Sequence, residues 1–346
     1  MMDERDDPYL WDRSGDEDPE IARLETLLQP LAHRRALGEL PARETETPVA
    51  VRRRGAGRVV VIVRNIAAAA AAVVLGFGLW FASSGLRGGW DVVALDGQPV
   101  VDGISVSAEG VLRRGGSLVT DGRSRARIHV GQIGRVDVDP GSRLALVAAG
   151  VREHRLSLES GTIHARIWAP PRFFFVNTPS AEAIDLGCAF TLHVDGDGAG
   201  LLRVTHGWVQ FAYEGREAFI PQGAVGATRP GFGPGTPRFE DAPSLFTSAL
   251  DLLDFGKADG AERAAALDQV LSSARPRDAL TLWHLLSRGS AAERGRVYDR
   301  LSALTPPPSR ATREAVLRGD RKALMAWWDS FEFEGTSFWS RLRSRF

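Results

Sequence analysis

The residues of this sequence that are best suited to chemistry are acids in short turns. Asp195–Gly200 reads DGDGAG, with acids at positions one and three and glycine at position six, as at the start of a calcium-binding loop. Position five is Ala199 and position twelve is His206, so the acid that would complete calcium coordination is missing. A glycine-rich hairpin turn explains the run, and we predict no calcium site there.

The histidines and the cysteine do not form a metal-binding pattern. Seven histidines are scattered without the paired spacing of zinc ligands, so we predict no metal. Cys188 is the single cysteine, which excludes an intrachain disulfide. It lies in the apolar run Leu186–Leu192, so we expect a buried thiol; the alternative is a reactive thiol, although no basic neighbour is present to lower its pKa.

No pattern typical of an enzyme is present. Asp137 and Asp139 share one face of a predicted strand, but they precede a Pro-Gly turn, and solvated turn acids explain them better than a catalytic pair does. The sequence has no Gly-x-Ser-x-Gly elbow, no phosphate loop and no dinucleotide fingerprint after a strand. We predict a protein that is not an enzyme and has no cofactor. An enzyme with an unrecognised site is the weakest alternative.

A long apolar stretch divides the chain. Within Val59–Ala82, the seventeen residues Ile66–Ala82 carry no polar side chain and would cover about 26 Å as a helix. With the preceding valines, the stretch is long enough for a bilayer, so we predict a transmembrane helix over residues 59–85; a buried core helix and a cleaved signal peptide are the alternatives. Four arginines lie in Arg52–Arg58, which predicts a cytoplasmic N-terminus. The expected location is the bacterial inner membrane, with the later domains periplasmic or extracellular.

An amphipathic helix is predicted before this stretch. Asp18, Pro19 and Glu20 form a helix-start signature, and leucines then recur at helical spacing up to about Leu37. One hypothesis is that this helix docks in a groove of a cytoplasmic partner, with Trp11 as an additional anchor. The other is a half-ordered tail without a binding role. The candidate partner-binding residues are Trp11, Leu24, Leu27, Leu28 and Leu31.

The pattern after the apolar stretch changes from strands to helices. Short alternating runs separated by glycine turns predict an all-β antiparallel domain, either a sandwich or a curled sheet. Leucine and alanine at helical spacing then predict a C-terminal α-helical domain, either HEAT-like or a bundle. The predicted fold class is therefore mixed and multi-domain. Its parts are a cytoplasmic tail (1–58), a transmembrane helix (59–85), a β domain (90–228), a Pro/Gly linker (229–243) and a helical domain (244–346). The predicted strands include Leu156–Leu158, Thr162–Ile167, Phe190–Val194 and Trp208–Tyr213.

The β region resembles the FecR domain of bacterial membrane-anchored regulators. Four segments carry the resemblance: LVTDGRSRARIHVGQIGRVDVDPGSRLAL, LSLESGTIHARI, FFFVNTPSAEAIDLGCAFTLHV and LLRVTHGWVQF. They contain the motifs of that family in its order: a PGS turn, a G-x-I strand, a V-x-TP-x-A strand, a DLGTxF-like strand and a closing V-x-x-G-x-V. Cys188 stands where threonine is common in the family. The resemblance covers Gly115 to about Gly226.

The resemblance implies a single-pass sensor or regulator that transmits a signal to a cytoplasmic sigma factor, as an anti-sigma factor does. The expected partners are the lipid bilayer, a sigma factor, and an unknown extracytoplasmic protein or glycan. Equal numbers of acidic and basic residues give no overall field for nucleic acid, which we do not expect as a partner. The alternative function is a structural or scaffold envelope protein that binds a cell-wall, polysaccharide or secretion partner.

Overall fold

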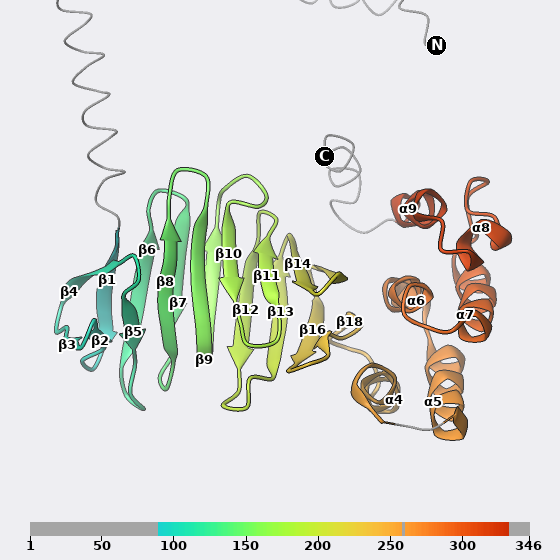
Figure 1. Cartoon of the computed structure of the whole chain (residues 1–346), viewed down its shortest axis with the longest axis horizontal. Helices are drawn as coiled ribbons and strands as arrows, with labels where there is room; N and C mark the ends of the chain where they lie inside the picture. The colour runs from blue at the N-terminus through green and yellow to red at the C-terminus, as the bar shows by residue number, and fades with distance from the viewer. Residues whose placement is uncertain (1–88, 258–259, 332–346) are drawn as a thin grey trace, which may run out of the picture. The chain divides into compact units, whose positions relative to one another are not determined.

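The computed structural model describes residues 89–257 and 260–331, which form two packed β-sheets followed by short helices (Figure 1). The first sheet, sheet A, contains, in order across it, β4 (Glu109–Arg113), β1 (Gly89–Asp96), β6 (Arg125–Val130), β7 (Gly134–Val138), β9 (His154–Ile167), β12 (Ala189–Val194), β13 (Gly200–His206) and β16 (Ala224–Arg229). Two short strands, β17 (Gly233–Pro234) and β18 (Arg238–Phe239), also pair with β16.

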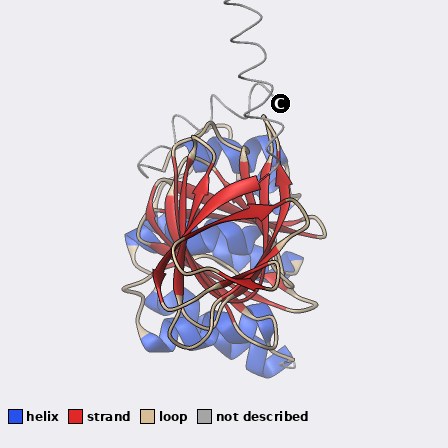
Figure 2. Ribbon diagram, turned by 90° about the vertical axis from the view of Figure 1, so that its left-hand side faces the viewer, coloured by secondary structure: helices blue, strands red, loops and turns tan. Residues whose placement is uncertain are grey.

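The second sheet, sheet B, shares β9 with the first. Its order is β3 (Ile104–Ser105), β2 (Val100–Val101), β5 (Ser117–Val119), β8 (Arg143–Ala149), β9, β10 (Phe174–Asn177), β11 (Glu182–Asp185), β14 (Trp208–Tyr213) and β15 (Arg216–Pro221). The pairing of β9 with β10 is parallel, whereas the other neighbouring strands in these two orders pair in antiparallel fashion. Figure 2 shows these strands curving around the interior of the β region.

Strand β9 joins the sheets because it bends at Gly161. Residues 154–160 of β9 pair with β8 in sheet B, and residues 161–167 pair with β12 and β7 in sheet A. Gly161 has φ +97°, and a Cβ atom there would lie 2.3 Å from Ser142 Oγ. Glycine is therefore required by both the backbone and the packing. The two strands predicted on either side of Gly161 are one continuous strand.

Alternation along the strands builds the core between the sheets. Phe190, Leu192 and Val194 of β12 are 2%, 0% and 1% exposed, which confirms the prediction that they share a buried face. Outward-facing residues of the same strand, such as His193, remain exposed. The buried apolar side chains of both sheets form a hydrophobic cluster that also includes residues of the helices.

The helices are short, and several begin with side-chain caps. They are α4 (Ser244–Phe255), α5 (Gly260–Ser273), a 3₁₀ turn η2 (Pro276–Asp278), α6 (Ala279–Leu286), α7 (Ala291–Leu304), α8 (Arg313–Leu317) and α9 (Arg321–Asp329). At α7, the Ser290 side chain accepts from the amide of Glu293, and the Glu293 side chain accepts from the amide of Ser290. The Asp320 carboxylate caps α9 in a similar way by accepting from two backbone amides.

Helices α6 and α9 cover the outer face of β14 and β15. The first four residues of β14 are buried, so this strand is covered on both faces. Val209 and Phe211 are fully buried members of the hydrophobic cluster, whereas Trp208 contacts Trp328 of α9. On β15, Phe219 contacts both Trp328 and His284 of α6.

The fold class predicted from the sequence is wrong and must be corrected. The described residues are mostly β-sheet, and their helical part is small. Its helices have 5 to 14 residues and bury their apolar faces in the same cluster as the sheets, so they do not build a core of their own. In residues 89–257 and 260–331, no helix has both the length and the apolar character that crossing a membrane requires. The segment predicted to do so, residues 59–85, lies outside the described residues.

Candidate functional site

The motif residues that carry the family resemblance lie at positions where the backbone is crowded. Gly161 packs on Ser142, the last residue of the PGS turn. Gly207 has φ +72°, and a Cβ atom there would lie 2.2 Å from the carbonyl oxygen of Gly187, which has φ +88° itself. The two glycines therefore support each other where β11, β12 and β14 meet. These motif positions hold the fold, and glycine is needed at each of them.

Asp185, also a motif residue, is a buried acid in a tight turn after β11. Its carboxylate accepts hydrogen bonds from the amides of Gly187 and Cys188 at 3.0 and 3.1 Å, and from the Cys188 thiol. Burial raises the pKa of Asp185 to about 6, against the opposing effect of these hydrogen bonds. Burial, with the nearby carboxylate, raises the pKa of the Cys188 thiol. Cys188 is 3% exposed, as expected for a buried thiol, and these shifts oppose formation of the reactive thiolate.

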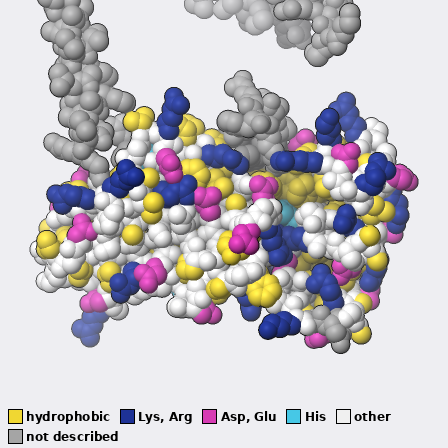
Figure 3. All heavy atoms as spheres, viewed as in Figure 1, with side chains coloured by type: hydrophobic (Ala, Val, Ile, Leu, Met, Phe, Trp, Pro, Cys, Tyr) yellow, Lys and Arg dark blue, Asp and Glu magenta, His cyan; other side chains and the backbone are white. Residues whose placement is uncertain are grey.

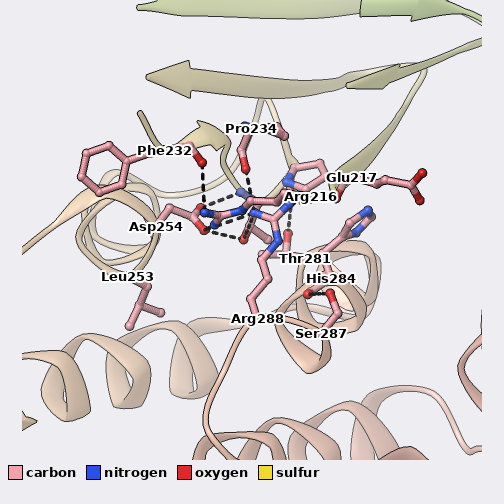
Figure 4. A network of polar contacts seen from close by, with 12 residues as sticks. Arg216, Glu217, Phe232, Pro234, Leu253, Asp254, Thr281, His284, Ser287 and Arg288 are labelled. Atoms are coloured by element: carbon pink, nitrogen blue, oxygen red, sulfur yellow. Dashed lines mark hydrogen bonds and ion pairs between the residues drawn. The ribbon is translucent and has the colours of Figure 1, made fainter. Parts of the chain in front are cut away.

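A second polar cluster joins the helices to the sheets, and its centre is Asp254 at the end of α4 (Figure 4). The Asp254 carboxylate accepts from the amide and the hydroxyl of Thr236 at 2.6 and 2.8 Å. It also accepts from the guanidinium groups of Arg216 on β15 and Arg288 after α6, at 3.2 and 3.3 Å. One buried acid therefore binds a strand, a loop and the end of another helix.

Arg288 makes the longest-range contacts of this cluster. Its side chain is 8% exposed. Besides Asp254 and Thr236, it donates to the carbonyl oxygens of Pro234 and Glu217 at 3.2 and 3.0 Å. Burial lowers the pKa of Arg288 to about 10, which leaves the guanidinium charged at neutral pH. A buried cation with these partners fixes the position of α6 relative to β15 and β17.

His284 of α6 makes a further contact between the helices and the sheets. Its Nδ1 atom lies 2.8 Å from the Leu280 carbonyl oxygen, and its Nε2 atom accepts from the Phe219 amide at 3.0 Å. These partners assign the proton to Nδ1 in a neutral imidazole. The Thr281 hydroxyl, one turn away, donates to the Pro237 carbonyl oxygen. The geometry is that of a structural junction between α6 and the strands and loops around it.

The acids singled out in the sequence have partners of their own. Asp137 accepts two hydrogen bonds from Arg127, at 2.5 and 3.1 Å. Asp139 pairs with Arg125 and lies 2.8 Å from His164 Nε2. The two acids therefore belong to different ion pairs. Asp195–Gly200 includes a turn closed by a hydrogen bond from the Gly198 amide to the Asp195 carbonyl oxygen, and no group of three metal-ligating side chains occurs within the described part of the chain.

The predicted partner-binding residues belong to the N-terminal segment of the chain. Trp11, Leu24, Leu27, Leu28 and Leu31 all lie outside the described residues.

On the face shown in Figure 3, cationic and anionic side chains are interspersed over both strands and helices, without a large field of one sign. Asp254 and Arg288 were not predicted from the sequence. One signal was available for the first of them, because Asp254 is an acid enclosed between Leu253 and Phe255 in an apolar helix.

Comparisons with known proteins give weak similarities. No family model matches the chain, and no curated protein matches it. Among solved structures, the chain is similar to two crystal structures of a putative anti-sigma factor from Parabacteroides distasonis. The first has a TM-score of 0.32 and 14% identity, and the match covers 38% of this chain and 63% of that one. The second has a TM-score of 0.32 and 13% identity, with 44% and 73% covered. A TM-score of this size assigns neither a fold nor a function.

Proposed function

We propose that this chain is a regulator of the FecR-domain type. In this proposal, residues 89–331 form a binding module that is not an enzyme, and the segment before them transmits the signal to a cytoplasmic sigma factor. The observation that carries the proposal is the use of the motif residues: Gly161, Gly187, Gly207 and Asp185 all maintain the backbone of the β region. The family resemblance thus rests on residues that this fold needs, and the outer surfaces are left for recognition.

The output is tested at the predicted amphipathic helix. Replacing Leu24 and Leu28 by Asp adds two charges to its apolar face and should release a partner that uses this face. The expected result is a changed transcription of a defined set of promoters, with loss of one protein that co-purifies with the full chain. RNA sequencing and mass spectrometry of the purified complex measure the two effects.

A matched control adds the same charge to the opposite face of that predicted helix. Replacing Thr26 and Gln29 by Asp should leave transcription and co-purifying proteins as they are, because these positions face away from the leucines. If the Leu24 and Leu28 variant behaves like this control, regulation through the tail is wrong.

The structural scaffold is the second candidate function, and one observation favours it. On the outer face of sheet A, Arg135 Nε is buried without a hydrogen-bond partner among the described residues. A scaffold would bind its ligand there and would not respond to substitutions in residues 1–58. The location at the bacterial cell membrane stays a prediction, which fractionation of cells producing the full chain tests.

A further inference from the structure

The outer face of sheet A carries its charged residues in rows that run across the strands. In one row, Asp91 of β1 lies opposite His129 of β6, His129 lies opposite Arg135 of β7, and Arg135 lies opposite Arg166 of β9. We call His129, Arg135 and Arg166 the arginine row. Directly opposed residues on one face have Cβ atoms about 5 Å apart, so the three basic side chains are neighbours.

The next row along the same strands is fully paired. Arg127 of β6 donates two hydrogen bonds to Asp137 of β7. The following residue of this row, His164, lies 2.9 Å from the Thr191 hydroxyl through Nδ1 and 2.8 Å from Asp139 through Nε2. Each basic side chain in this row therefore has an acceptor within the protein.

The arginine row differs because it has no such acceptors. Within residues 89–257 and 260–331, no hydrogen bond or close ion pair joins the side chains of Arg135 or Arg166 to another group, and Arg135 Nε is buried without a hydrogen-bond partner. The Asp137 carboxylate attracts Arg135 electrostatically but is already hydrogen-bonded to Arg127. Like charges directly opposite each other on a sheet are destabilising. The adjacent row shows that the same strands can hold acids between bases. The arginine row is therefore suited to an anion supplied from outside the chain.

Two further features lie at the ends of this row. Trp168 follows Arg166 by two residues, just past the end of β9, and is 71% exposed; strand alternation gives the two residues the same face. At the other end, a cavity of about 320 Å³ is lined by Asp91, Glu109 and His129, together with neighbouring residues of β1 and β4. The surface thus combines an exposed aromatic ring, two unpaired guanidinium groups, and a small cavity with two carboxylates.

We propose that this surface binds an acidic polysaccharide, that is, a glycan whose sugars carry carboxylates. This rests on the proposed function, in which residues 89–331 are a binding module. The guanidinium groups of Arg135 and Arg166 match carboxylates in a two-pronged geometry. Asp91 and Glu109 accept hydrogen bonds from sugar hydroxyls in a cavity of the size that small ligands fill. Trp168 offers its apolar face to a sugar ring.

The carboxylates of Asp91 and Glu109 favour this ligand over a polyanion with more closely spaced charges, such as a nucleic acid. A nucleic acid also binds surfaces that combine cations with an exposed aromatic ring, but such surfaces are positively charged along their whole length. In this surface, Asp91 directly follows the arginine row, and Glu109 lines the same cavity. These acids repel a continuous run of phosphates and favour a ligand that alternates carboxylates with hydroxyls.

The test is a calorimetric titration of the purified full chain with oligosaccharides of galacturonate, alginate and hyaluronan. At least one should bind, with an affinity that falls as salt is raised, and its methyl ester should not bind. The variant Arg135→Gln/Arg166→Gln should bind at least about tenfold more weakly, since the loss of one charged hydrogen bond alone contributes a factor of this order. Trp168→Ala should also weaken binding.

The matched control is Arg143→Gln, which removes an exposed arginine that pairs with Glu159 on the outer face of sheet B. It should bind as the parent chain does, and all variants should keep the parent's circular dichroism and melting temperature. Equal binding by the arginine-row variant, equal binding of the methyl ester, binding of none of the three glycans, or tighter binding of polyglutamate or single-stranded DNA would overturn the proposal. The titration does not depend on transcription, so failure of this inference is separate from failure of the Leu24 and Leu28 test.

Discussion

The two outer faces of the β region meet different surroundings. The face of β14 and β15 in sheet B is covered by α6 and α9, and its side chains are aromatic or belong to the hydrogen-bonded junction around Asp254. On the face of β6, β7 and β9 in sheet A, most side chains are charged, and they are half-buried or exposed. The comparison separates side chains that hold the fold together from side chains that the fold does not use.

Burial accounts for the difference in polar pairing. A buried charge without hydrogen bonds is costly, so Asp254 and Arg288 are surrounded by donors and acceptors. On the open face, water solvates a side chain that lacks a protein partner, so Arg166 can remain unpaired at little cost in stability. A charged side chain without a protein partner is therefore expected only on an exposed face, and only there can it indicate a binding site.

The largest expected effect contrasts one tryptophan from each face. Trp328 is 1% exposed, and its ring centroid lies 4.6 Å from that of Trp283 and 5.7 Å from that of Trp208. Trp328→Ala should lower the free energy of unfolding by about 3–5 kcal/mol. Trp168→Ala, on the open face, should change it by less than about 0.5 kcal/mol. Chemical denaturation followed by far-ultraviolet circular dichroism measures both, and equal losses would mean that the faces are not distinct.

A pH prediction contrasts a buried acid with one on the open face. Burial raises the pKa of Asp185 to about 6, whereas for Asp137 the effect of burial is outweighed by its hydrogen bond and attraction to Arg127, which lower its pKa. Because the folded pKa of Asp185 is above the unfolded value of 3.8, the folded chain holds more protons between these values. Its contribution to stability is present below the unfolded pKa and is lost as pH rises through about 6.

The loss attributable to Asp185 between pH 4 and pH 7 is about 2–3 kcal/mol, at 1.36 kcal/mol per pKa unit. Asp185→Asn should remove this part of the pH dependence, because the amide stays neutral and its oxygen can still accept from the turn amides. Denaturation curves at several pH values measure the slope. An unchanged slope in the variant would show that Asp185 is already ionised at the lower pH.

A smaller effect compares the ion pairs of the two faces. Asp254→Asn keeps the shape of the side chain but removes its charge from Arg288 and Arg216, and should cost about 1.5–3 kcal/mol. Asp137→Asn does the same to the partly exposed pair with Arg127 and should cost about 0–1 kcal/mol. Melting temperatures of the two variants give the ranking. A larger loss for Asp137→Asn would reverse the assignment of the covered face as the structural one.

Much of the local structure could be predicted from sequence periodicity. The predicted strand Trp208–Tyr213 agrees with β14, and the region predicted to be helical, 244–346, contains α4 and α7. The continuity of β9 was missed because Ser160-Gly161 resembles a turn, whereas the glycine provides a bend packed on Ser142. A local pattern does not distinguish a bend inside a strand from the end of one.

The junction between helices and sheets was beyond prediction because its contacts connect distant residues. Arg216 reaches Asp254 across 38 residues, and the Phe219 amide reaches His284 across 65. The largely apolar sequence of α6, whose eight residues are all buried, predicts burial but not which surface covers the helix. The helices were therefore assigned to a separate domain. The arginine row was missed for a similar reason, since its members meet only through strand register.

The most direct test of the account is the amide hydrogen exchange of Phe219 in the full chain. This amide points from β15 to His284 of α6 and not to a neighbouring strand, so it is protected only while the helix stays docked. If helices and sheets form one cooperative unit, Phe219 should exchange about as slowly as the amides of β7 in the middle of sheet A. Fast exchange at Phe219 with slow exchange in β7 would contradict the account, because the helices would then open independently of the β-sheets.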